Sequence, residues 1–172
     1  SLPLDANAQS PVTTHFAAAG KLQLDATYSS AAGADSGLNM SGSSTFVVTP
    51  VGFCVQSTDT NSDCASGDAT CTAFVAAGAA FNLDVIAKAW ESNADTDLCT
   101  GTSTTPNYVQ SSIPLTHTLI APTGGRTSSG TLGVSSIDIT TGGTASLSTQ
   151  SISEVGVFTI TAAPTAGTYL DG

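Results

Sequence analysis

The sequence predicts an all-β fold: an immunoglobulin-like antiparallel β-sandwich preceded by an N-terminal strand and linker. Short segments of alternating apolar and polar residues recur along the chain, and Gly-, Asn- and Asp-rich turns separate them. No segment sustains a helical period over three turns. We expect residues 46–172 to form the sandwich module. Residues 1–45 would hold the terminal strand of a preceding module plus a linker.

The first predicted strand lies within residues 16–28, before a stretch rich in Gly, Ser, Ala and Asp. Its apolar face, at a period of two, is formed by Leu22, Leu24, Ala26 and Tyr28. The stretch that follows, residues 29–44, predicts a loop or linker. The next strand is expected at residues 46–55, where Pro50 indicates an edge position or a bulge.

The middle of the chain predicts a hairpin formed by residues 72–76 and 80–90 around Ala77-Gly78. Trp90 ends the second arm and is interpreted as a core side chain. The later strands are expected at residues 113–119, 132–139, 145–152 and 157–162, with a turn at Gly142-Gly143. The predicted core is Phe81, Leu83, Val85, Leu115, Leu119, Phe158 and Ile160.

A short segment occurs twice, about one domain length apart. Residues 19–26 and 155–162 each read as a glycine turn followed by a strand, and their apolar positions coincide when Gly20 is aligned with Gly156. This pattern predicts tandem modules of one kind. The first copy carries little of its own sandwich, so we expect it to pair with another sheet. That sheet would belong to a preceding module, to a neighbouring copy in a filament, or to the edge of residues 46–172.

Composition excludes several classes of partner. The formal net charge is −10, with 13 acidic residues and only 3 Lys and Arg. Nucleic acid and anionic membranes are therefore poor partners. Membrane insertion is not expected, because no apolar run approaches the length of a spanning helix.

The four cysteines predict two disulfides and an oxidising compartment, and thus an extracellular or cell-surface location. They contain no CxxC pair, which argues against zinc. The predicted hairpin would bring the residue before its first arm close to the loop that follows its second arm. The expected pairs are therefore Cys54–Cys64 and Cys71–Cys99.

An acidic loop is the candidate metal site. Asp59, Asn61 and Asp63 alternate as the first ligands of a calcium loop do. An EF-hand is excluded, since Cys64 stands where Gly is needed and Thr70 where Glu is needed. A looser site would draw on Asp68, Asp95 or Asp97 if the two polar loops meet. The default interpretation is a solvated acidic loop with weak or no calcium binding, and no other cofactor is expected.

No catalytic constellation is apparent, so we do not expect an enzyme. His117 alternates with Leu115 and Leu119, which favours a packed, hydrogen-bonded histidine over a triad member. Glu91 and Glu154 are too sparse for a carboxylate pair. Trp90 and Tyr108 offer an aromatic platform for a sugar, so host or matrix glycans are alternative partners.

An ordered series of motifs runs through the chain. It comprises Phe53-Cys54-Val55, Cys71-Thr72-Ala73-Phe74, Ala77-Gly78, Trp90, Thr105-Pro106-Asn107-Tyr108, Leu115-Thr116-His117, Ala121-Pro122, Gly124-Gly125, Leu132-Gly133-Val134 and residues 153–162. This series resembles the repeat module of bacterial MshQ-like proteins, outer-surface proteins associated with the mannose-sensitive hemagglutinin pilus. The resemblance implies a β-rich module, a secreted or surface location and a pilus or adhesion context. It implies no ligand and no catalytic residue.

These observations together predict a structural or adhesive module of a bacterial extracellular surface or pilus-associated protein. A self-assembling filament subunit held by strand addition is the first alternative. A carbohydrate- or calcium-binding module is the second. The expected partners are neighbouring copies or modules of the same protein, joined by strand pairing.

Overall fold

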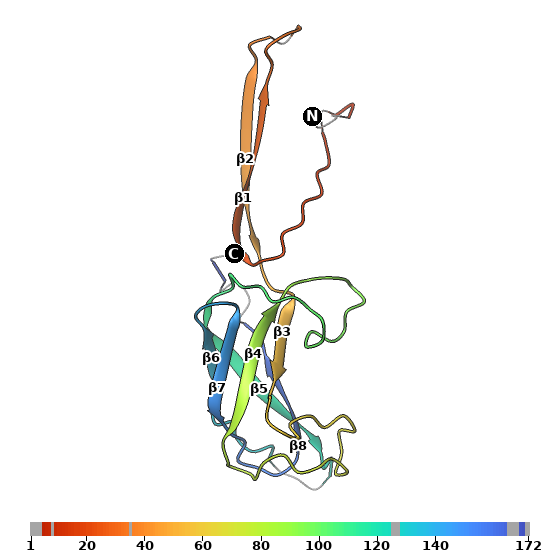
Figure 1. Ribbon diagram of the computed structural model, residues 1–172, viewed down its shortest axis with the longest axis vertical. Coiled ribbons are helices and arrows are strands. Elements are labelled where there is room, and N and C mark those ends of the chain that lie inside the picture. Colours follow the sequence, from red (N-terminus) through yellow and green to blue (C-terminus); the bar gives the residue numbers. More distant parts are fainter. Residues whose placement is uncertain (1–4, 8, 35, 125–127, 165–168, 171–172) are drawn as a thin grey trace.

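The computed structural model describes residues 5–7, 9–34, 36–124, 128–164 and 169–170. Within these ranges the chain forms eight strands and no helix, and every strand pairing is antiparallel. The all-β expectation is thereby confirmed. The strands form two parts, a two-stranded ribbon that we call the arm and a six-stranded body (Figure 1).

The arm consists of β1 (Gly20–Ser29) and β2 (Asn39–Val48), which pair along their whole length from Gly20 opposite Val48 to Ser29 opposite Asn39. Figure 1 shows it projecting from one end of the body along the long axis. The prediction of a loop at residues 29–44 is therefore wrong for residues 39–44, which belong to β2. Gly and Ser there conceal a strand because β2 is almost entirely exposed, so no buried apolar face marks it in the sequence.

The strand expected at residues 46–55 is divided in two. Its first residues finish β2, and its last residues belong to β3 in the body. Pro50 lies between the two strands, because proline lacks the N–H that a paired strand would use. Residues 49–51 thus form the junction between the arm and the body.

The body contains two three-stranded sheets that face each other across the core. The strand order of the first is β3 (Gly52–Gln56), β4 (Phe81–Lys88), β7 (Thr144–Gln150). The order of the second is β6 (Ser136–Ile139), β5 (Gln110–Ala121), β8 (Val157–Ala162). The strand predicted at residues 157–162 coincides with β8, and that at 113–119 lies in β5. The strand predicted at 145–152 overlaps β7 but extends two residues beyond its end at Gln150. Residues 132–135 lie outside β6.

Both sheets contribute side chains to the core. Phe81, Leu83, Val85 and Leu115 are buried, as predicted. The other three expected core residues, Leu119, Phe158 and Ile160, are partly buried. The core also contains residues outside the predicted core set: Ala19, Tyr108, Ile113, Ile137, Ile139 and Tyr169.

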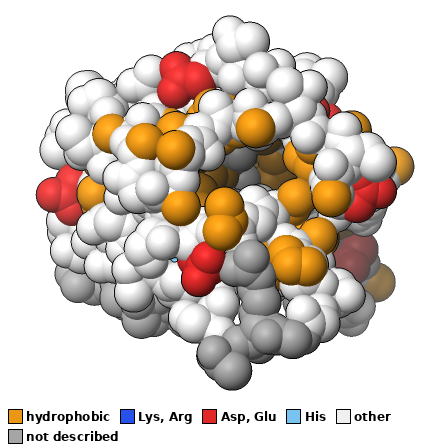
Figure 2. Space-filling view, turned by 90° about the horizontal axis from the view of Figure 1, so that it is seen from below, with side chains coloured by type: hydrophobic (Ala, Val, Ile, Leu, Met, Phe, Trp, Pro, Cys, Tyr) orange, Lys and Arg blue, Asp and Glu red, His pale blue; other side chains and the backbone are white. Residues whose placement is uncertain are grey.

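The core is most closed near the arm. Seen from the opposite end, the body shows hydrophobic side chains around a hollow (Figure 2). Partly buried apolar residues of the core include Phe74, Leu132 and Ile152. Ala19 and Tyr108, by contrast, are almost completely inaccessible.

The hairpin predicted at residues 72–76 and 80–90 is wrong. Residues 72–76 form no strand, and β4 pairs instead with β3 and β7. Trp90 is not a core side chain either, because β4 ends at Lys88 and the indole is 50% exposed. The alternation along residues 81–89 identified a real strand but could not identify its neighbours.

Candidate functional site

The loop after β3 holds the predicted calcium ligands. The Asp59 carboxylate accepts hydrogen bonds from the main-chain N–H of Asn82 at 2.8 Å and from its side-chain amide at 2.7 Å. These bonds, the main-chain one foremost, hold the pKa of Asp59 below its ordinary value. Asn61 has a left-handed backbone, with φ of 65°, in the tight turn that follows. Asp59 thus anchors the loop to the start of β4.

Calcium binding by Asp59, Asn61 and Asp63 stays a prediction. Among the described residues, no three or more His, Cys, Asp or Glu side chains are grouped so that they would hold a metal ion.

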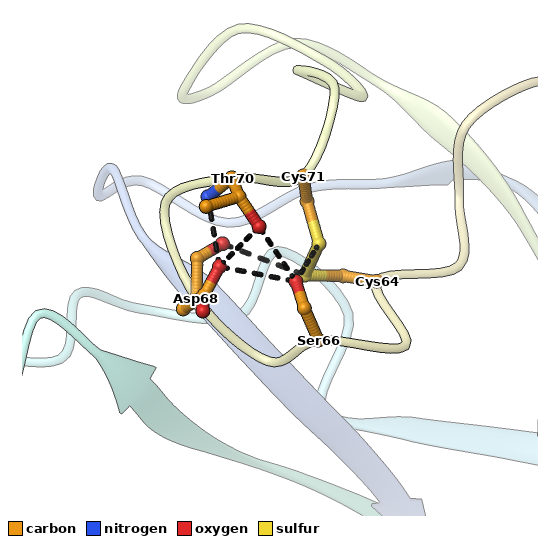
Figure 3. Close-up of a disulfide and its surroundings, with 5 residues drawn as sticks. All are labelled: Cys64, Ser66, Asp68, Thr70 and Cys71. Atoms are coloured by element: carbon orange, nitrogen blue, oxygen red, sulfur yellow. Dashed lines mark hydrogen bonds between the residues drawn. A yellow bond between two sulfur atoms is a disulfide. The ribbon is translucent and has the colours of Figure 1, made fainter.

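Asp68, further along this loop, lies in a turn that a disulfide closes (Figure 3). Asp68 accepts hydrogen bonds from the Thr70 hydroxyl at 2.6 Å, the Thr70 main-chain N–H at 2.8 Å and the Ser66 hydroxyl at 3.0 Å. The Thr70 hydroxyl is the foremost cause of a lowered pKa of Asp68. The Cys64–Cys71 disulfide joins the two ends of this turn. The turn is therefore held both covalently and by hydrogen bonds to one carboxylate.

The two polar loops do not meet. Residues 57–80 connect the end of β3 to the start of β4, whereas residues 89–109 leave the other end of β4 (Figure 1). Eight residues of extended strand separate them, a length of about 26 Å. The wider calcium site that would have joined Asp68 to Asp95 or Asp97 is thus excluded. Asp95 instead accepts the Thr102 hydroxyl at 2.9 Å, within its own loop.

The disulfides differ from the predicted pairs. The structure joins Cys54 to Cys99 and Cys64 to Cys71, so Cys54–Cys64 and Cys71–Cys99 are wrong. The loop after β4 folds back over β3, where Leu98 packs against Gly52, at a position where a Cβ would meet the Leu98 side chain. Cys99 therefore reaches Cys54 on β3. The Cys54–Cys99 bond fixes the loop at the arm end of the body.

The candidate catalytic residues have structural partners. A ring nitrogen of His117 lies 3.1 Å from the Ser129 carbonyl oxygen, and its ring packs near Phe158 at 5.9 Å between centroids. This placement matches the expected packed, hydrogen-bonded histidine. The ring of the other histidine, His15, lies 6.0 Å from the ring of Trp90, between centroids. The Glu154 carboxylate accepts the N–H of the next residue, Val155, at 2.8 Å.

Trp90 and Tyr108 do not form a shared sugar platform. Tyr108 is completely buried and stacks on Tyr169, with 4.8 Å between ring centroids. Only Trp90 is accessible, and its indole N–H donates to the Asn93 side-chain oxygen at 3.2 Å. The sequence pattern could not separate these two aromatic residues, because both lie outside regular strands.

The arm carries an exposed apolar surface, of which the sequence identified the β1 half, Leu22, Leu24, Ala26 and Tyr28. Cross-strand partners in an antiparallel ribbon share one face. One face of the arm is therefore formed by the pairs Leu22–Phe46, Leu24–Ser44, Ala26–Gly42 and Tyr28–Met40. We call it the apolar face of the arm. Its large side chains are solvent-exposed: Leu24 by 48%, Tyr28 by 43%, Met40 by 54% and Phe46 by 41%.

The opposite face of the arm is polar and forms its own hydrogen bonds. The Gln23 side-chain amide donates to Asp25 at 2.7 Å, and the Ser29 hydroxyl donates to the Asn39 side chain at 2.7 Å. Residues 22–26 pair with β2 along one edge. Pairing with a preceding module or a neighbouring copy stays a prediction. The signal for the β1–β2 hairpin was the placement of Met40, Phe46 and Val48 at even-numbered positions of β2, on the same face as the apolar residues of β1.

Comparison with known proteins identifies a family. A family model described as "DUF6701, second domain" matches residues 49–150. The chain belongs to this family. The matched range starts directly after β2 and ends with β7, so it covers most of the body and leaves the arm outside. No curated protein and no solved structure matches the chain. In the described residues, no helix has the length and apolarity to cross a membrane.

Proposed function

We propose that the chain is a structural module of a bacterial extracellular surface protein, with the arm as its attachment element. The observation that carries this proposal is the amphipathic arm projecting from a disulfide-bonded body. An isolated two-stranded ribbon is at best marginally stable in water. An exposed apolar face on such a ribbon is typical of a surface that another protein segment covers.

The two disulfides support the extracellular part of the proposal. One joins β3 to the loop after β4, the other closes a turn in the loop after β3, and all four cysteines are paired. Such bonds persist in oxidising compartments and are rare where thiols are kept reduced. An association with adhesion or a pilus rests on the resemblance to MshQ-like repeats, since the DUF6701 description names no activity.

The strand pairing supports an immunoglobulin-like body. Taking β3 to β8 as strands A, B, C, C′, E and F, the first sheet pairs B with E and the second pairs C with F, as in immunoglobulin domains. The inter-sheet disulfide typical of antibody domains has no equivalent, because Cys54 lies on β3 and bonds to a loop. The body is therefore proposed as an immunoglobulin-like variant with its own covalent bracing.

A filament subunit held by strand addition is the second candidate. It is favoured by the outer edges of β1 and β2, which pair with no third strand within the described part of the chain. Such edges present main-chain N–H and C=O groups to a further strand.

The test of the main proposal uses the cells that produce the protein. A protease added to intact cells should remove the body, and alkylation of intact cells should modify none of the four cysteines. Lysed cells serve as the positive control for protease access. Protection in intact cells together with alkylated cysteines would place the protein inside the cell and contradict the proposal.

A further inference from the structure

We propose that the apolar face of the arm packs against the same face of a second copy, in a two-fold pair with antiparallel arms. The inference rests on the proposed function only in treating the arm as the attachment element, and it names the partner.

Charge favours a second copy on this face. The only charged residues of the arm are Lys21 and Asp25, and both lie on the polar face, opposite Val47 and Ser43. Two apolar faces can therefore meet without burying a charge. The body, in contrast, holds most of the acidic residues behind the net charge of −10. Antiparallel arms place the two acidic bodies at opposite ends of the pair, which lowers their repulsion.

Shape also favours the antiparallel arrangement. When the two-fold axis passes between the Leu24–Ser44 and Ala26–Gly42 pairs, position 24 of one copy faces position 26 of the other. The exposed Leu24 then lies over the shallow notch that Ala26 and Gly42 leave. A two-fold operation repeats this contact, so each copy supplies one projection and one notch.

The ends of the apolar face are complementary in the same register. Position 22 of one copy faces position 28 of the other, and position 46 faces position 40. Leu22 then packs on Tyr28, and Phe46 packs on Met40, a sulfur–aromatic contact of a favourable kind. A parallel arrangement would bring the bodies side by side instead.

The extent of the face predicts a weak, reversible dimer. Ten residues of strand give a ribbon about 33 Å long, with strands about 4.8 Å apart. Two such faces bury on the order of 800 Å² together, below the ~1,200 Å² of standard specific interfaces. The association should therefore depend on protein concentration.

The first experiment is sedimentation velocity of the 172-residue chain over a wide concentration range. We expect a monomer–dimer equilibrium. Leu24→Asp should abolish the dimer, because it buries a charge at the centre of the interface. Thr27→Asp is the matched control on the polar face and should keep it. Leu24→Ala, which adds no charge, should weaken the dimer if Leu24→Asp proves to unfold the arm.

The second experiment measures the arrangement. Ala32→Cys places a spin label in the exposed connection between β1 and β2. Antiparallel arms should separate the two labels by on the order of 40 Å, and parallel arms would bring them close together.

The outcomes separate the inference from the proposed function. A chain that stays monomeric at every concentration, a dimer that survives Leu24→Asp and Leu24→Ala, closely spaced labels, or open-ended filaments would each overturn the two-fold arm pair. A monomer on the cell surface would leave the proposed function standing. A dimer of an intracellular protein would contradict the function and leave the pair standing.

Discussion

Asn82 donates two hydrogen bonds to the carboxylate of Asp59, although 23 positions separate the two residues. The contact ties the acidic loop to the first residues of β4. It also gives the loop a pH dependence, because only the ionised carboxylate accepts both bonds fully.

Replacing Asp59 with Ala should therefore flatten the acid side of the stability curve. The pKa of Asp59 in the folded chain lies below the ordinary value of 3.8, chiefly through the main-chain N–H of Asn82. Its contribution is complete above pH 3.8 and is lost as pH falls through the folded pKa. Urea unfolding at several acidic pH values measures the slope. Asp63→Ala, in the same loop, is the control, and equal slopes in both variants would contradict the prediction.

Replacing Tyr108 with Phe should stabilise the body. The side chain is completely buried, and its hydroxyl has no hydrogen-bond partner among the described residues. Removing such a group should raise the free energy of unfolding by roughly 1–3 kcal/mol. Tyr28→Phe, on the exposed arm, should change it little. A loss of stability in Tyr108→Phe would show that the hydroxyl has a partner.

The same variant should alter the alkaline side of the curve. Burial, with a smaller contribution from Tyr169, raises the pKa of Tyr108 to about 12. Folding is independent of the ionisation of this group below pH 10.0 and becomes less favourable as pH rises from 10.0 towards about 12, because the unfolded chain releases the Tyr108 proton before the folded chain does. Tyr108→Phe should lose less stability over this interval than the parent.

The two disulfides should differ in their contribution to stability. Cys54–Cys99 spans 45 residues and Cys64–Cys71 spans 7. Loop-closure entropy assigns about 4 kcal/mol to the first and about 2.5 kcal/mol to the second. Chemical denaturation of Cys54→Ala/Cys99→Ala and Cys64→Ala/Cys71→Ala double variants tests this order. Peptide mapping without reduction checks the pairing itself.

The turn between β6 and β7 offers a matched pair of glycine substitutions. Gly142 and Gly143 both have left-handed backbones, with φ of 67° and 69°. A Cβ at Gly142 meets only ordinary contacts, whereas one at Gly143 would collide with the Thr105 carbonyl oxygen. Gly142→Ala should cost about 1–2 kcal/mol from the backbone alone, and Gly143→Ala clearly more. Equal melting temperatures would contradict the close approach of residue 105.

Alternation predicted the strands that bury one face, and it failed for a strand that is exposed on both faces. β8 and most of β5 and β7 were found because their core side chains recur at every second position. β2 was missed because its Gly and Ser residues are exposed and its partner lies across a connection. The disulfides were misassigned because the pairing of Cys71 with Cys99 depended on a hairpin that the structure does not contain. The sequence could not show that the two acidic loops lie at opposite ends of β4, because their separation becomes visible only once the strands are placed in the sheet.

The entry and exit of the chain at one end of the body have a mechanical consequence. Ala19, just before the arm, and Tyr169, beyond β8, are both buried in the same core cluster, and Tyr169 stacks on Tyr108. Tension transmitted along the chain between these two points acts across one end of the body. It does not pull along the strands from one end to the other. The body therefore lies beside the line of force, and the contacts around Ala19 and Tyr169 bear the load before the strand ladders do.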